Sequence, residues 1–258
     1  MRFVVSSFWL PRHGSPVEHY EDAFCPRRTG ARSAPRLRVA VADGASESML
    51  SGLWAELLVR SWCRSRRRDM GEVVEFAMGA WHEALRTYLE SRQAASRPIE
   101  WFEEPGLDRG AHATVLGVEL RRSPEGGAAW RAESLGDSCL FQVRGDDLVA
   151  AFPLEDAAAF CNTPKLVPSQ ARQLDRVVAS LERAEGHCRD GDVLFLATDA
   201  IAAWFLAAAA GGDAPWRDLA ALTPGDLDAF AAWAGRQRDG GLLRNDDVTV
   251  VRVEVGAP

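Results

Sequence analysis

The chain has 258 residues, of which 47% are hydrophobic and 26% are charged, as in an ordinary soluble globular protein. These proportions exclude a disordered tail, a collagen and a coiled coil. The formal net charge of -7 argues against nucleic acid as the main partner, because binding to phosphates needs a basic surface. No repeat and no low-complexity linker interrupts the chain, so we expect a single domain over residues 1–258.

Two apolar segments raise the question of a membrane signal. Residues 2–10 are followed by no small-residue cleavage site, which argues against a signal peptide. The run from 193 to 210 is nearly long enough to span a bilayer, but a mid-membrane Asp199 would cost about 3 kcal/mol. We therefore interpret this run as a buried strand, a functional aspartate and a helix, and expect no membrane association.

The first half of the chain predicts a strand and two helices. Residues 36–42 (RLRVAVA) form a β-branched apolar run that is typical of a strand. Apolar residues then recur every three or four positions up to Trp62, which predicts an amphipathic helix. Four arginines between 64 and 68 follow, either as a solvated helix end or as a docking patch. A second helical pattern runs from 73 to 89, which suggests an antiparallel helix pair.

The second half predicts mostly strands. Strand-like runs cover residues 114–120, 128–135, 139–144, 148–152, 193–198 and 248–255. Very short connections with Gly and Asp join the second, third and fourth of these runs, as in antiparallel hairpins. Helical character is found near residues 169–184, 201–210 and 227–238. Antiparallel strands interrupted by helices predict an α+β layered domain.

The five cysteines are far apart in the sequence and odd in number. They contain no C-x-x-C pair, so neither a disulfide framework nor a zinc site is supported. Reduced thiols are typical of a cytoplasmic protein, which is the localisation we expect.

Acidic residues stand repeatedly at the ends of the predicted apolar strands. They are Glu21, Asp22, Asp43, Asp137, Asp199, Asp246 and Asp247. A carboxylate beside a buried strand is costly unless it is paired, hydrogen-bonded or bound to a metal. Each one alone can be a turn former or a helix cap. Together they suggest an acidic cluster that a hard cation such as Mg²⁺ or Mn²⁺ would stabilise through oxygen ligands.

Six motifs in order give the chain a family resemblance. They are HYEDAF (19–24), VADGAS (41–46), GAHAT (110–114), SLGDSCLF (134–141), LFLATDAI (194–201) and NDDVTVV (245–251). Each motif alone is weakly specific, but the ordered set resembles the metal-dependent Ser/Thr protein phosphatases of the protein phosphatase 2C family. The match spans residues 19 to 251, and it suggests a divergent bacterial-type member.

The resemblance implies a four-layer α-β-β-α sandwich with two antiparallel sheets and a site for two Mn²⁺ or Mg²⁺ ions. Asp43 would bridge both ions. Glu21 and the carbonyl of Gly44 would hold one ion, and Asp199 and Asp246 the other. The motifs further imply Asp22 as a supporting residue and Asp137 in a weaker third metal site.

The resemblance also implies the reaction. A metal-activated water would attack the phosphorus of a phosphoserine or phosphothreonine, so no side chain would act as the nucleophile. The expected partners are a phosphorylated protein and a Ser/Thr kinase, with no role for nucleic acid or membrane.

The chain departs from the family pattern at several positions. Val17 stands where the family has a phosphate-binding arginine, and Arg12 and His19 are weak candidates to replace it. The Gly-Gly after Asp43-Gly44 is replaced by Ser46 and Glu47. The region 153–190, where the family carries its flap, matches poorly. A catalytically weak or inactive relative that binds phosphoproteins or regulates a kinase is therefore the alternative.

A serine hydrolase is a third hypothesis from the same residues. Gly44-Ala45-Ser46-Glu47-Ser48 between a strand and a helix is a near miss to a G-x-S-x-G nucleophile motif. Asp137 and His187 follow in the order that a catalytic triad would need.

Overall fold

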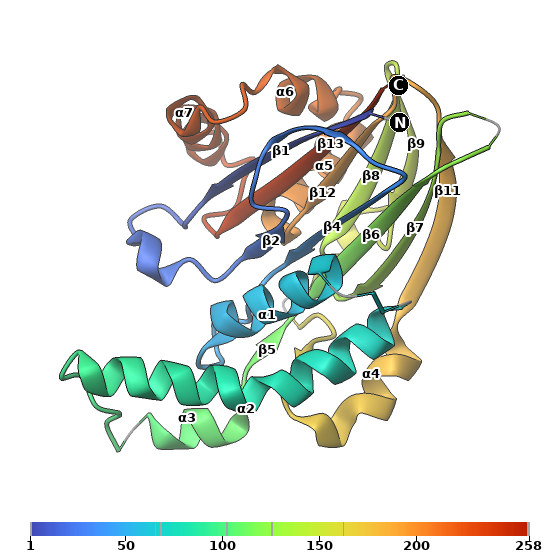
Figure 1. Cartoon of the computed structure of the whole chain (residues 1–258). Coiled ribbons are helices and arrows are strands. Elements are labelled where there is room, and N and C mark those ends of the chain that lie inside the picture. Colours follow the sequence, from blue (N-terminus) through green and yellow to red (C-terminus); the bar gives the residue numbers. More distant parts are fainter. Residues whose placement is uncertain are drawn as a thin grey trace.

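Two antiparallel β-sheets packed face to face form the centre of the computed structural model, with helices on both outer faces (Figure 1). The structure describes residues 2–64, 66–67, 69–101, 103–124, 126–161 and 163–256. The predicted α+β class and the four-layer α-β-β-α arrangement are both confirmed.

The two sheets take their strands from distant parts of the chain. The six-stranded sheet has the order β3 (Gly30–Ser33), β1 (Arg2–Leu10), β13 (Val248–Gly256), β12 (Val193–Ala197), β8 (Cys139–Arg144) and β9 (Asp147–Phe152). The five-stranded sheet has the order β11 (Glu182–Cys188), β7 (Ala128–Leu135), β6 (Val115–Arg122), β4 (Arg36–Ala42) and β2 (Ala23–Cys25). A further short pair joins β5 (His112–Ala113) and β10 (Val167–Pro168).

Strand alternation divides the core into an inner layer and two outer layers. In β4, Val39 and Val41 face the six-stranded sheet, whereas Ala40 and Ala42 face the helices. The inner layer also receives Val251 and Val253 from β13. Burial of these branched side chains on both sheets fixes the strand register, because a one-residue slip would expose them.

Two groups of helices cover the outer faces (Figure 1). The five-stranded sheet is covered by α1 (Ser51–Arg64) and α2 (Met70–Ala94), with α4 (Leu174–Ser180) packed beside α2. The six-stranded sheet is covered by α5 (Asp199–Ala210), α6 (Pro215–Ala221) and α7 (Leu227–Asp239). The short α3 (Glu104–Arg109) precedes β5, and 3₁₀ helices occupy Val17–His19, Ala157–Ala159 and Ala171–Gln173.

Several predicted elements differ from the structure in their limits. The helical prediction over 169–184 is wrong at its end, since α4 stops at Ser180 and β11 begins at Glu182. β11 is an edge strand with mostly exposed side chains, so it lacks the apolar alternation that identifies a strand. Residues 2–10, which carried no strand prediction, pair with β13 inside the sheet. Within the described ranges, no helix is both long enough and apolar enough to cross a bilayer.

Candidate active site

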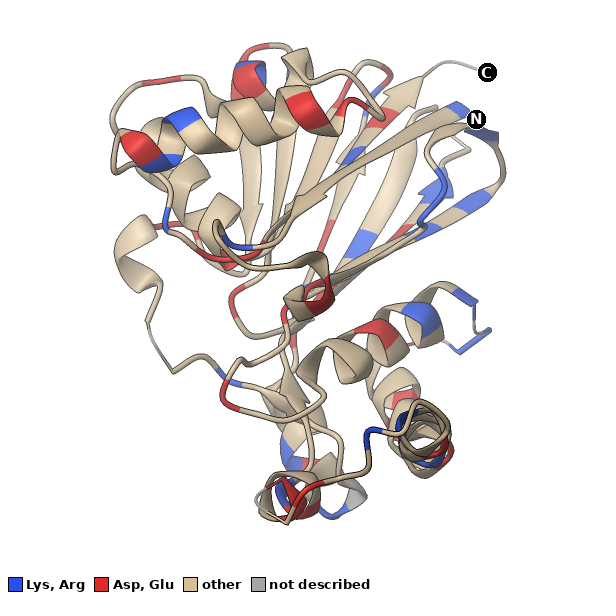
Figure 2. Ribbon diagram, turned by 90° about the vertical axis from the view of Figure 1, so that its left-hand side faces the viewer, with Lys and Arg blue, Asp and Glu red and all other residues tan. Residues whose placement is uncertain are grey.

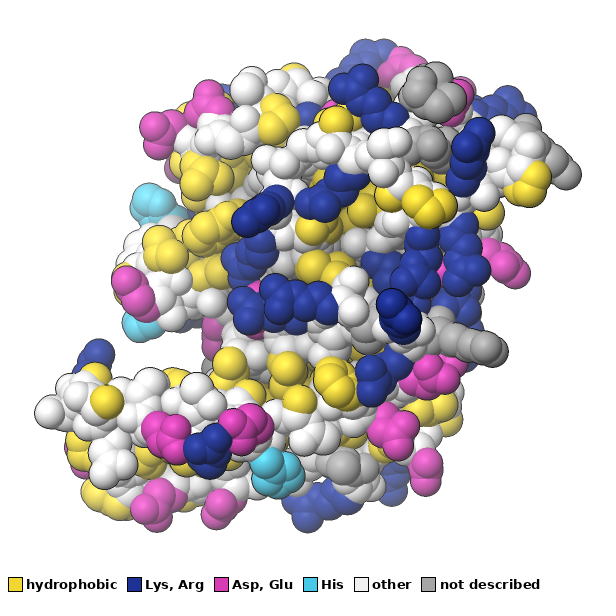
Figure 3. Space-filling view, viewed as in Figure 1, with side chains coloured by type: hydrophobic (Ala, Val, Ile, Leu, Met, Phe, Trp, Pro, Cys, Tyr) yellow, Lys and Arg dark blue, Asp and Glu magenta, His cyan; other side chains and the backbone are white. Residues whose placement is uncertain are grey.

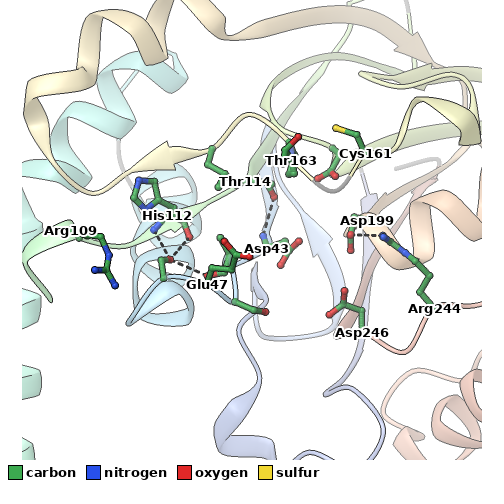
Figure 4. A pocket seen from close by; sticks show the side chains of 18 of the residues that line it. Asp43, Glu47, Arg109, His112, Thr114, Cys161, Thr163, Asp199, Arg244 and Asp246 are labelled. Carbon is green, nitrogen blue, oxygen red and sulfur yellow. Dashed lines mark hydrogen bonds and ion pairs between the residues drawn. The ribbon is translucent and has the colours of Figure 1, made fainter. Parts of the chain in front are cut away.

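A pocket of about 550 Å³ opens at one end of the sandwich, where strands from both sheets finish. Figure 2 shows that several loops carrying Asp and Glu gather at this end of the strands. The acidic residues that line the pocket are Asp137 and the four labelled in Figure 4, which are Asp43, Glu47, Asp199 and Asp246. The topology therefore brings together four carboxylates that the sequence analysis selected, from positions about 200 residues apart.

Asp43 and Gly44 follow directly after β4. The backbone N–H of Asp43 donates to the Thr114 hydroxyl (3.2 Å), and the Thr114 N–H donates to the Asp43 carbonyl (2.8 Å). A Cβ on Gly44 would lie 2.8 Å from the carbonyl oxygen of Glu21 and 2.8 Å from the backbone carbon of Ser51. Only glycine fits between these two segments, so Gly44 allows α1 and the residues before β2 to approach the end of β4.

The other carboxylates come from the six-stranded sheet and from the turn that joins the sheets. Asp137 lies in the turn between β7 and β8. Asp199 is the first residue of α5, directly beyond β12 and Thr198. Asp246 lies two residues before β13, which pairs with β12. Adjacent antiparallel strands place the end of one beside the start of the next, and this pairing brings Asp199 and Asp246 to the same side of the pocket.

Glu21 and Asp22 lie before β2, next to this pocket but not among the residues that line it. The Glu21 carboxylate accepts a hydrogen bond from the Ser51 hydroxyl at the start of α1. The buried Asp22 carboxylate accepts from the hydroxyls of Thr198 (2.9 Å) and Thr249 (2.7 Å). Asp22 thus connects β2 to the ends of β12 and β13, a supporting position next to Asp199.

The pKa values of these carboxylates show that the site is short of positive charge. Burial raises the pKa of Asp43 well above its usual value, and nearby carboxylates, Asp22 and Asp199 foremost, raise it further. Burial and the charge of Asp199 raise the pKa of Asp137 to about 6. Burial also raises the pKa of Asp199, although Arg244 acts in the opposite direction. Crowded, desolvated carboxylates of this kind are typical of sites that take a cation.

The residues present fit a hard divalent cation in their chemistry. One carboxylate oxygen of Asp137 is buried and has no hydrogen-bond partner in the described part of the chain. The carboxylates offer oxygen ligands, which Mg²⁺ and Mn²⁺ prefer. No three His, Cys, Asp or Glu side chains among the described residues are already arranged around a single metal position. The guanidinium of Arg244 is instead paired with Asp199 (Figure 4).

Basic side chains reach the pocket from positions that the sequence analysis did not select. Arg12 and His19 do not line it, and Arg12 instead donates to the Ser15 hydroxyl at 2.9 Å. The cationic and imidazole groups that do line it are Arg109, Arg244 and His112. Arg244 directly precedes the NDDVTVV motif, and this adjacency was the signal available in the sequence.

The structure contradicts the catalytic triad of the serine hydrolase hypothesis. Ser46 and Asp137 line the acidic pocket, but His187 lies in β11 and lines a different pocket. The His187 ring hydrogen-bonds with the carbonyl of Gly126 at 3.1 Å. His187 therefore does not reach Ser46.

Comparison with known proteins identifies the fold. No family model matches the chain, and no curated protein matches its sequence. The Mycobacterium tuberculosis serine/threonine phosphatase PstP is similar in structure over 100% of both chains, with a TM-score of 0.57 and 15% identity. The serine/threonine phosphatase of S. agalactiae gives a TM-score of 0.55 and 14% identity, covering 98% of this chain and 99% of that one. RsbX in complex with magnesium gives 0.52 and 13% identity, covering 99% and 96%.

Proposed function

We propose that this chain is a metal-dependent phosphoprotein phosphatase that hydrolyses the phosphate monoesters of serine and threonine. It has the fold of bacterial phosphatases of the protein phosphatase 2C type, as the sequence motifs predicted. The observation that carries this proposal is the meeting of Asp43, Asp137, Asp199 and Asp246 in one pocket of that fold.

The residues around the pocket have distinct proposed roles in holding Mn²⁺ or Mg²⁺. Asp43 would contribute to two metal positions, one completed by Glu21 and the Gly44 carbonyl and the other by Asp199 and Asp246. Asp137 would belong to a weaker third position. Bound divalent cations supply charge for the phosphoryl oxygens and acidify water, so that water can serve as the nucleophile near neutral pH. RsbX, with the same fold, was solved with magnesium, which supports the choice of ion.

The protein's own hydrogen bonds hold these ligands in place. The Ser51 hydroxyl fixes the Glu21 carboxylate, and Asp22 fixes the ends of β12 and β13 through Thr198 and Thr249. Such restraint limits the reorganisation that ligands would otherwise undergo on binding a cation. Asp22 therefore acts through Asp199 and Asp246 and touches no substrate.

The substrate phosphate needs a cationic group, and Arg244 is the best placed candidate. Its side chain is 48% exposed and borders the pocket on the side of Asp199. A cation bound at Asp199 would compete with the guanidinium for that carboxylate, and the freed Arg244 could then pair with a phosphate. Arg109 borders the pocket from the end of α3 and provides a second positive charge. We propose a phosphorylated protein as the substrate, a Ser/Thr kinase as the functional partner and the cytoplasm as the location.

The test is hydrolysis of p-nitrophenyl phosphate and of a phosphothreonine peptide by the purified chain with Mn²⁺, with Mg²⁺ and with a chelator. Turnover is expected only with metal, and Asp43→Asn should lower kcat by at least about a thousandfold. Asp146→Asn is the matched control, because this exposed carboxylate pairs with Arg217 away from the pocket. Metal-independent turnover, or full activity of Asp43→Asn, would refute the proposal.

A second candidate is a non-catalytic relative that binds phosphoproteins or regulates a kinase. The observation that favours it is the ion pair between Arg244 and Asp199. In this pair the guanidinium already neutralises a carboxylate that the phosphatase proposal assigns to a metal ion. Titration calorimetry with Mn²⁺ separates the two candidates. The absence of binding at millimolar Mn²⁺ would favour the regulatory function, whereas stoichiometric binding with turnover would exclude it.

A further inference from the structure

Two cysteines that the phosphatase proposal does not use lie side by side on the outer face of the five-stranded sheet. Cys25 is in β2, at the edge of the sheet, and Cys63 is near the end of α1. Both thiols are free, both are partly buried, and both pack against the core beneath α1. No local sequence pattern predicts this pair, because 37 residues separate the two positions.

The contacts of β4 explain why the thiols meet. Cys25 is paired in register with Ala40, and the two side chains share the helix-facing side of the sheet. The Cys63 thiol donates to the carbonyl of Arg38, two residues away on β4, at 3.5 Å. Cys25 and Cys63 therefore both lie against the segment of β4 from Arg38 to Ala40, on the same side of the sheet. A disulfide between them would join β2 to α1 without crossing the sheet.

The surroundings favour reaction at Cys25. The hydrogen bond with Cys63 lowers the pKa of Cys25, and the positive charges of Arg64 and Arg32 lower it further against burial and Glu56. Figure 3 shows this side of the molecule, where Lys and Arg side chains gather in a band across the middle. A thiolate in a positive, partly exposed environment is the reactive form of cysteine. Burial and the hydrogen bond with Cys25 raise the pKa of Cys63, so Cys63 is the less acidic thiol.

We infer that Cys25 and Cys63 form a reversible oxidation site, which a peroxide converts into a disulfide linking β2 to α1. The inference does not depend on the phosphatase proposal. The segment before β2 also contacts the first residue of α1, where the Ser51 hydroxyl donates to the Glu21 carboxylate. The disulfide would add a covalent link near the last residue of α1.

The chemistry balances with hydrogen peroxide as the oxidant. The Cys25 thiolate attacks one peroxide oxygen, forming an S–O bond while the O–O bond breaks and hydroxide leaves. The Cys63 sulfur then attacks the sulfenic acid, forming the S–S bond and releasing water with the Cys63 proton. Two thiols lose two electrons in total, and one peroxide becomes two waters. A thiol reductant reverses the step.

Peptide mapping of the full chain provides the test. The protein is treated with a small excess of hydrogen peroxide, blocked with N-ethylmaleimide and digested with trypsin without reductant. We expect a cross-link between the peptides covering residues 13–27 and 61–64, and its loss after dithiothreitol. The oxidised protein should also unfold at a temperature several degrees higher than the reduced protein, since the bond restrains the unfolded chain.

Three serine variants make the result specific. Cys63→Ser should abolish the cross-link and leave a sulfenic acid on Cys25 that dimedone labels. Cys25→Ser should abolish both the cross-link and that label. Cys161→Ser is the matched control, since Cys161 is the exposed cysteine, and it should form the cross-link as the wild type does. Full maleimide labelling of Cys25 and Cys63 after peroxide treatment of the folded protein would overturn the inference, as would sulfinic acid at Cys25 with no cross-link.

Discussion

Two regions of this protein bury carboxylates in opposite ways. On the helix-facing side of β6, Glu119 is 3% exposed and is bonded by Arg38 and Arg121. At the end of the sandwich, Asp43 and Asp137 are surrounded by other carboxylates. Burial raises the pKa of Glu119, but the bonds from Arg38 and Arg121 outweigh it and leave the pKa below its usual value. Burial and like charges together raise the pKa of Asp43.

The difference separates a carboxylate whose charge is balanced inside the protein from one whose charge is not. Asp192 repeats the first pattern, with bonds from Arg144 (2.8 Å) and Gln142 (2.7 Å) that overcome the effect of burial on its pKa. A carboxylate whose charge is balanced inside the protein contributes to folding and has little left to offer a ligand. A buried carboxylate whose charge is not balanced lowers the stability of the fold. Such carboxylates are common at functional sites, where a bound cation can balance the charge.

The largest expected effect on stability comes from Glu119, whose charge is balanced by Arg38 and Arg121. Glu119→Gln removes the charge that balances the buried Arg38 guanidinium, so we expect the free energy of unfolding to fall by about 3–5 kcal/mol. Asp43→Asn, measured without metal, should lower it by far less, because this variant removes a like-charge repulsion. Urea unfolding of both variants at pH 7.5 makes the comparison. Equal losses in the two variants would show that the distinction between the regions is wrong.

Divalent cations should stabilise the protein by binding at the acidic pocket around Asp43, where the carboxylate charges are not balanced. At a free Mn²⁺ concentration about 100 times its dissociation constant, the unfolding free energy should rise by about 2.7 kcal/mol. A thermal scan with and without Mn²⁺ measures the rise, and Asp43→Asn should remove it. Glu119→Gln should show the same rise in unfolding free energy with Mn²⁺, although it is less stable than the wild type without Mn²⁺. An increment that survives in Asp43→Asn would place the cation elsewhere on the molecule.

The smallest expected effect is a pH dependence from Asp137. Its folded pKa of about 6 lies above the value near 3.9 of an unfolded aspartate, so the ionised form is disfavoured in the folded state. The metal-free protein should therefore lose stability as the pH rises from about 4 to about 6. Asp137→Asn should be more stable than the wild type by about 1–2 kcal/mol at pH 7.5, and the gain should vanish near pH 4. A gain that persists unchanged at pH 4 would mean that the carboxylate charge is not its cause.

Much of the fold could be predicted from local patterns. The limits of β4, β7 and β8 match the predicted runs, because apolar residues recur along these strands and short turns with Gly or Asp mark their ends. The edge strands β11 and β3 escaped prediction, since their exposed side chains carry no such pattern. Asp199 lies in the pocket with three other predicted site residues, although α5 starts at this residue rather than two residues later.

The sequence by itself determined which side chains could bind a hard cation, because a carboxylate directly after an apolar strand is costly wherever that strand goes. The tertiary structure decided which of them meet. It placed Asp43 from one sheet opposite Asp199 and Asp246 from the other, and it brought Arg244 and Arg109 to the pocket in place of Arg12 and His19. It also placed Cys25 beside Cys63. Proximity between distant residues depends on how the sheets pair and stack, and no local periodicity encodes that arrangement.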